Sequence, residues 1–200
     1  MENKKILVID MNCIMAACLP LYADRINPDE NITVSWNILE SRYGLEKFLC
    51  VDTSILFRIA DILKQAKSEI TFLDSSKELP LLITEPSEII SIDFFDDFSV
   101  SSDELAAMDA SGKFNSQNWA RFLYMCGKMP SFTWINFPKS IGDFPPVGMI
   151  SSDNLFVVSE KNADISGEKF DKIFVCDSPY IPEKFRYIFD LFKTIFGGAE

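Results

Sequence analysis

Hydrophobic residues along the chain fall into six short runs that are separated by longer segments of mixed pattern. The runs are rich in β-branched and aromatic side chains, and they cover residues 6–9, 70–73, 89–92, 132–135, 155–158 and 173–176. Each run is apolar apart from at most one Thr or Ser, instead of alternating, which is typical of strands that are covered on both faces, as in a parallel sheet. The pattern therefore predicts about six strands of a mostly parallel sheet.

Three segments between these runs have the spacing of amphipathic helices. They follow the capping residues 52–54, begin near Asn115 or Ser116, and extend from Pro182 towards the C-terminus. Strands that alternate with helices predict an α/β fold, a three-layer α/β/α sandwich. No linker or repeat divides the sequence, so residues 1–200 are expected to form a single domain.

Two long segments follow neither period. Residues 24–47 contain an Asn-Pro pair and further asparagines, and residues 137–153 contain three prolines and two glycines. We expect both to be loops over one end of the sheet. Loops of this length are either functional or plain connections, and the pattern leaves both interpretations open.

The charge of the chain narrows the classes of partner. Nineteen basic residues against 30 acidic ones give a formal net charge of -11, so no nucleic-acid partner and no anionic membrane surface are expected. The N-terminal apolar run at residues 14–21 is too short to span a bilayer. Five scattered cysteines with no C-x-x-C pair favour a cytoplasmic location. An unidentified protein or peptide partner is expected, and the acidic surplus would suit a basic one without singling it out.

The sequence contains no histidine. This excludes histidine triads, histidine-based zinc sites and imidazole proton shuttles. Cys13 and Cys176 follow or end apolar runs, but no histidine is present to activate a thiolate, so both are interpreted as buried structural thiols.

Polar residues end each of the six predicted strands. They are Asp10, Asp74, Asp93, Asn136, Ser159 and Asp177. Because parallel strands end at one edge of a sheet, these side chains are expected to line a common site. Several carboxylates there favour a divalent metal ion or a guanidinium or ammonium group. Aspartates after strands also cap helices, and this structural interpretation stays open for each of them.

The densest acidic cluster lies just after the third run, in the sequence Ile-Asp-Phe-Phe-Asp-Asp-Phe at residues 92–98. Asp93, Asp96 and Asp97 are close enough in sequence to share oxygen-ligated Mg²⁺ or Mn²⁺. The alternative is a turn at a strand end in which one acid caps the following helix.

This cluster resembles the D-x-H-x-D metal motif of the arginase and deacetylase superfamily, in particular its peptide-arginase-like branch. The opening segment at residues 6–12, the pair Asn118-Trp119 and the segment at residues 174–180 are similar to that family as well. The resemblance implies an arginase-like parallel sandwich. It also implies hydrolysis of a guanidinium group to ornithine and urea by a pair of manganese ions.

Aligned with that motif, Asp93 and Asp97 match the two aspartate ligands, and Phe95 stands at the histidine position. A phenylalanine ring does not coordinate a metal ion, so Asp93 and Asp97 are at most a weak metal site. No cofactor is expected, and Mn or Mg is the alternative. The residues expected to line the site are Asp10, Asn12, Asp74, Phe95, Asp96 and Asp177. The resemblance favours an arginase-like protein that has lost binuclear catalysis and acts by binding, with no assigned catalytic residue.

A second resemblance keeps catalysis. Asp10-Met11-Asn12 after the first run is distantly similar to the nucleophile loop of haloacid dehalogenase-like phosphatases, with Thr84 and the acids of residues 93–97 as further candidates. It implies a Mg-dependent hydrolase that uses aspartates only. The sequence departs from that pattern at Asn12, where a second acid is expected. The pattern also requires a lysine between Thr84 and the acidic cluster, and no lysine lies there. Whether the chain is an enzyme therefore stays open. The sequence does not determine the oligomeric state either, although the terminal helix could pack against a second copy.

Overall fold

A computed structural model describes most of the predicted elements. The described residues are 4–17, 49–51, 53–93, 107, 119–136, 155–159, 165, 167–178, 181 and 183–198. The predicted loops at 24–47 and 137–153 lie outside them, as does Pro182.

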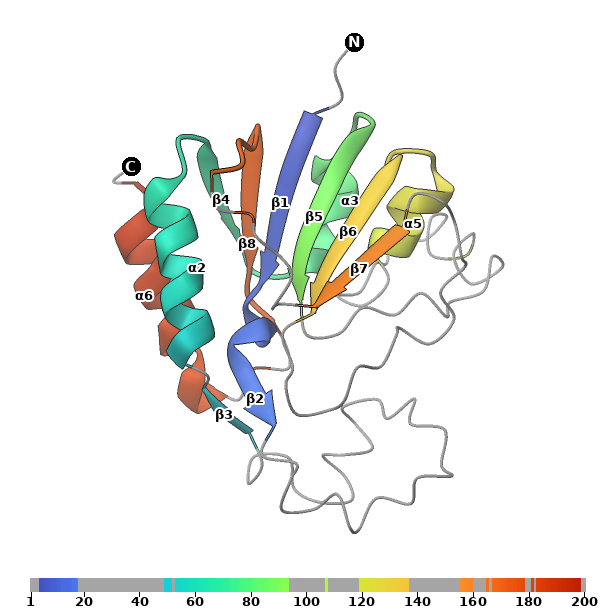
Figure 1. The fold of residues 1–200 in the computed structure, drawn as a ribbon. Helices are drawn as coiled ribbons and strands as arrows, with labels where there is room; N and C mark the ends of the chain where they lie inside the picture. The colour runs from blue at the N-terminus through green and yellow to red at the C-terminus, as the bar shows by residue number, and fades with distance from the viewer. Residues whose placement is uncertain are drawn as a thin grey trace.

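Six parallel strands form the central sheet (Figure 1). They are β1 (Lys4–Asp10), β4 (Glu69–Leu73), β5 (Ser87–Asp93), β6 (Ser131–Asn136), β7 (Leu155–Ser159) and β8 (Lys172–Cys176). Their order across the sheet is β4-β8-β1-β5-β6-β7, and every neighbouring pair is parallel. The predicted α/β class and parallel sheet are confirmed.

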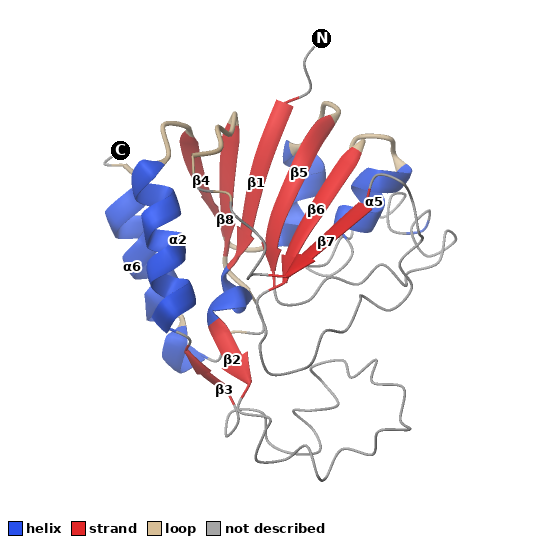
Figure 2. Ribbon diagram, viewed as in Figure 1, coloured by secondary structure: helices blue, strands red, loops and turns tan. Residues whose placement is uncertain are grey.

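Two further strands, which the hydrophobic pattern does not predict, make a small antiparallel ribbon. They are β2 (Met15–Ala17) and β3 (Leu49–Val51), and β2 follows β1 through a 3-10 turn, η1 (Met11–Ile14). Figure 2 shows this ribbon beyond the carboxyl end of β1. The strand count of the described chain is thus higher than the predicted six.

Helices cover both faces of the sheet. The helical elements after η1 are α2 (Thr53–Gln65), η5 (Ser76–Glu78), α3 (Leu79–Leu82), α5 (Trp119–Met125), η7 (Glu183–Phe185) and α6 (Tyr187–Phe196). Figure 1 shows α2 and α6 on one face, with α3 and α5 on the other. The predicted helix after residues 52–54 is confirmed as α2, and the predicted terminal helix is confirmed as η7 followed by α6.

Two hydrophobic clusters separate the layers. The first joins strand residues such as Ile9 and Ile92 to Ile59 of α2 and Phe189 of α6. The second joins residues of the opposite face to α3 and α5, for example Val8, Ile89, Leu79 and Trp119. Because successive residues of a strand point to opposite faces, the mainly apolar runs supply both clusters at once.

Candidate functional site

The winding of the chain reverses between β1 and β5. From β1 the chain passes through α2 to β4 on one side of the sheet, and from β5 it passes through α5 to β6 on the other side. The two helices also lie on opposite faces. In open parallel sheets a ligand binds in the crevice at such a reversal, beyond the carboxyl ends of the two strands. The ends of β1 and β5 are therefore the first place to look for a site.

Asp10 ends β1 and Asp93 ends β5. The parallel register pairs Ile9 with Ile92, so the two aspartates that follow stand beside each other on strands that lie about 4.8 Å apart. By strand alternation both side chains share the face of Val8 and Ile89, which α3 and α5 cover. Both are buried, with exposed fractions of 1% and 0%. The structure thus brings together two of the predicted site residues as a buried carboxyl pair.

Hydrogen bonds fix the Asp10 carboxyl group. Its Oδ1 accepts the backbone N–H of Asn12 at 3.1 Å, and its Oδ2 accepts the Ser76 hydroxyl at 3.1 Å. Burial raises the pKa of Asp10 from 3.8 to about 7, and the negative charge of Asp177 adds to the rise. Hydrogen bonds from Asn12, Ser76 and Ser178 oppose it because they favour the ionised form. Asp10 is therefore poised to exchange a proton near neutral pH.

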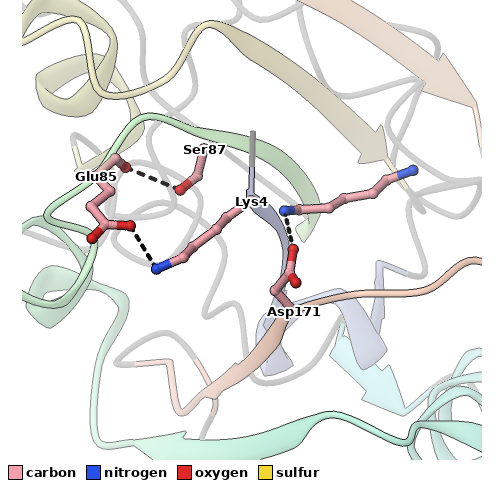
Figure 3. Close-up of polar contacts among 5 residues, drawn as sticks. Lys4, Glu85, Ser87 and Asp171 are labelled. Atoms are coloured by element: carbon pink, nitrogen blue, oxygen red, sulfur yellow. Dashed lines mark hydrogen bonds and ion pairs between the residues drawn. The ribbon is translucent and has the colours of Figure 1, made fainter. Parts of the chain in front are cut away.

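Removing the Ser76 hydroxyl should raise the pKa of Asp10 above its value of about 7. The Ser76→Ala variant loses a hydrogen bond that stabilises the carboxylate, and nothing else on Ser76 replaces it. The measurement is a carboxyl-carbon NMR titration of Asp10. Ser87→Ala is the matched control, because Ser87 is equally buried but donates to the Glu85 carbonyl at the opposite edge of the sheet (Figure 3). An unchanged or lower Asp10 pKa in Ser76→Ala would contradict the assignment of this bond.

A second polar group lies on the β8 side of Asp10. The Asp177 N–H donates to the Leu73 carbonyl at 2.9 Å, and Asp177 Oδ1 accepts the Ser178 N–H at 2.8 Å. Asp177 is half-buried, and burial raises its pKa. Asp74 lies at the same edge but is exposed. Both are predicted site residues at the carboxyl edge of the sheet. Asp177 lies near Asp10, whereas the side chain of Asp74 is exposed to solvent.

The two cysteines of this edge are buried, as expected. Cys176 pairs with Asp10 across β8 and β1, and Cys13 lies in the turn that follows β1. Burial raises the pKa of both thiols, and the charges of Asp10 and Asp93 raise it further. A thiol in this environment resists ionisation, which fits the structural role expected for both cysteines.

The backbone at the end of β5 is held from the neighbouring strand. The indole N–H of Trp134 in β6 donates to the Asp93 carbonyl oxygen at 3.2 Å. This bond fixes the backbone at Asp93, the last described residue before the acidic cluster continues in the sequence. Phe95, Asp96 and Asp97 lie outside the described residues. Within the described segments, no group of three potential ligands is arranged to hold a metal ion.

Thr84 stands at the wrong edge for the phosphatase-like arrangement. It follows α3 and precedes Ser87, the first residue of β5, whereas Asp10 lies at the carboxyl edge. The amino edge carries its own polar contacts, shown in Figure 3, including an ion pair between Lys4 and Glu85 at 2.6 Å. The expectation that Thr84 accompanies Asp10 is therefore wrong.

Sequence reasoning missed the two serines that contact Asp10. Ser76 lies 66 residues from Asp10 in the chain, and Ser178 follows Asp177 at the end of β8. Serines are common beyond strand ends, so no local pattern marks these two. Their sequence signal is their position, because Ser76 and Ser178 come shortly after Asp74 and Asp177, the acids that directly follow β4 and β8. This signal becomes useful once the strand order is known.

Comparisons with known proteins identify no relative, so any functional proposal must rest on the geometry of the site. No family model matches the chain, and no curated protein or solved structure is significantly similar to it. None of the described helices is long and apolar enough to cross a membrane.

Proposed function

We propose that this chain is an arginase-like binding protein that has lost binuclear manganese catalysis. Its ligand or protein partner is held at the carboxyl edge of the sheet, with a cationic group against Asp10 and Asp93. The observation that carries this proposal is the burial of these two carboxyl groups side by side where the winding reverses. Two buried carboxyl groups this close disfavour joint ionisation, and a shared proton or a bound cation relieves that cost.

Loss of catalysis rests on the sequence of the acidic cluster. Phe95 stands where the resemblance requires a histidine ligand, and the chain has no other histidine to replace it. A guanidinium or ammonium group needs no such ligand set, because carboxylate oxygens accept its hydrogen bonds directly. The net charge of -11 further favours the approach of a basic partner.

Binding of a cationic ligand at this site should release a proton at neutral pH. Because the Asp10 pKa is about 7, a cation that favours the carboxylate displaces the proton that the empty site retains. Calorimetric titration of a short arginine-rich peptide, in two buffers of different ionisation enthalpy, measures both affinity and proton release. Asp93→Asn should weaken binding at least about tenfold. Asp61→Asn, which removes an exposed carboxylate from α2, should leave it unchanged.

The same peptide with citrulline in place of arginine is the matched ligand control, since it keeps the shape and loses the charge. Equal binding of both peptides would contradict a cationic site. Stoichiometric manganese in protein purified without chelator, together with arginine-dependent urea release that Asp93→Ala abolishes, would overturn the loss of catalysis.

A Mg-dependent hydrolase that uses aspartates only is the second candidate. It is favoured by the hydroxyl of Ser76 on the carboxylate of Asp10, at the end of a central strand. Magnesium-dependent hydrolysis of a generic phosphomonoester, lost in Asp10→Asn, would support this candidate over the binding protein.

A further inference from the structure

A buried arginine on α5 lacks a partner for its charge. Arg121 is 8% exposed, while Met125, one turn further along the same helix, is 45% exposed. Of the three guanidinium nitrogens of Arg121, Nε is fully enclosed and has no hydrogen-bond partner in the described chain. The guanidinium carbon lies 6.0 Å from the ring centroid of Tyr124. That distance is at the outer limit of a cation–π contact, so the aromatic ring does little to replace a counter-ion.

The elements around α5 supply no acid for Arg121. α5 itself and β6, against which Trp119 packs, contain no aspartate or glutamate. η5 and α3 also pack against α5, and their one acid, Glu78, makes no ion pair with Arg121. The described ion pairs instead join lysines of β1 to glutamates at the amino edge of the sheet. Among the residues that the structure describes, nothing therefore neutralises the charge of Arg121.

An unneutralised guanidinium in the protein interior is costly. Arginine keeps its proton in proteins, so the side chain does not avoid this cost by becoming neutral. Removing a charge from water destabilises the folded chain unless an opposite charge is placed beside it. The planar fork of a guanidinium fits two oxygens of a carboxylate or a phosphate group, with two parallel hydrogen bonds. Burial without an acid partner therefore favours an oxyanion from outside the chain.

We propose that Arg121 is the receptor for an oxyanion, a carboxylate or phosphate group carried by a ligand. Because Nε alone is both enclosed and unpaired, the two terminal nitrogens are the donors that a ligand reaches from solvent. Hydrogen bonds to an ionised group gain strength where water is largely excluded. This site lies on α5 and uses neither Asp10 nor Asp93, so it does not rest on the function proposed above.

NMR of the arginine side chains tests the proposal on the wild-type chain. The Nε–H resonance of Arg121 is followed during titration with inorganic phosphate and, separately, with acetate, in a chloride buffer of constant ionic strength. We expect a saturable shift of this resonance, while that of Arg186, an exposed arginine beside α6, stays fixed. A larger response to phosphate assigns a phosphorylated ligand, and a larger response to acetate assigns a carboxylate. No saturable shift with either anion would overturn the proposal.

Urea unfolding measures the same binding through stability. An anion that binds the folded chain alone raises the urea concentration at the midpoint of unfolding. Arg121→Met keeps an apolar stem and removes the charge, so it should require at least about tenfold more of the anion for the same rise. Arg186→Met is the matched control and should respond like the wild type. A rise that Arg121→Met retains in full would come from a general effect of the salt on stability, and would contradict the proposal.

Arg121→Lys takes the place of Arg121→Met if the latter does not fold by circular dichroism. It keeps the positive charge but loses the planar fork, so the response to the preferred anion should be weaker than in the wild type. An undiminished response would contradict recognition by the guanidinium group.

Discussion

Replacing Asp10 by asparagine should raise the free energy of unfolding by about 4 kcal/mol near pH 8 and change it little near pH 4. The reason is the cost of keeping an ionised carboxylate in the second hydrophobic cluster. Asp10 is 1% exposed, and burial is the largest cause of its raised pKa. Asparagine has nearly the same shape and carries no charge at any pH.

The sign follows from proton binding in the two states. The folded chain holds the Asp10 proton up to a pKa of about 7, whereas the unfolded chain releases it near the ordinary value of 3.8. Between these values the folded state binds more protons, so the free energy of unfolding of the wild type falls as pH rises. Each pKa unit corresponds to about 1.4 kcal/mol, and the loss is complete above about pH 7.

Asparagine also preserves the contacts of the carboxyl group. Its Oδ1 can accept the Asn12 N–H, and its amide nitrogen can donate to the Ser76 hydroxyl, which has its own acceptor lone pairs. The Ser178 hydroxyl, which also bonds the Asp10 carboxyl group, can rotate to accept the second amide N–H. The substitution therefore removes the ionisation cost and keeps a hydrogen-bond partner for each of these groups. Such a gain in stability is expected if the proposed site trades folding stability for ligand binding.

Urea unfolding of the wild type and Asp10→Asn at the two pH values measures this effect, after dialysis against a chelator. Asp61→Asn is the control, since Asp61 is exposed on α2 and should show no such pH-dependent gain. A destabilised Asp10→Asn near pH 8 would contradict the prediction. That result would mean that a cation or a donor group holds Asp10 ionised in the folded protein.

The strands could be predicted from sequence because their signal is local. The run at residues 6–9, for example, is apolar at every position because Ile6 and Val8 enter one cluster and Leu7 and Ile9 enter the other, on opposite faces of the sheet. A buried helix, by contrast, has no such preference for β-branched side chains, so their enrichment in these short runs indicates strands. The start of α2 was equally visible, because residues 52–54 offer capping side chains before a regular apolar spacing.

The site could be predicted only in part, because its geometry depends on strand order. Asp10 and Asp93 are recognisable as strand-end acids, but their adjacency comes from the pairing of β1 with β5, elements that stand more than 70 residues apart. Nothing local says that β8 lies between β4 and β1. The same long-range order brings Ser76 to Asp10 and sets Thr84 at the far edge.

The second large effect is expected at the contact between α5 and the sheet. Phe132 in β6 is 1% exposed, and its ring meets that of Trp119 in α5 edge to face, with centroids 6.1 Å apart. Replacing a buried phenylalanine by alanine removes its transfer free energy and leaves a cavity. Phe132→Ala should therefore lower the free energy of unfolding by about 3–5 kcal/mol.

Phe57→Ala provides the matched control, because Phe57 on α2 is 70% exposed and the same atoms are removed from solvent instead of from the core. Its effect on urea unfolding should stay within about 0.5 kcal/mol. The pair tests whether α5 packs where the second cluster places it, over the face that carries Asp10 and Asp93. Equal losses in the two variants would show that β6 and α5 do not form this contact. The proposed crevice at the reversal would then lose the helix that covers one of its sides.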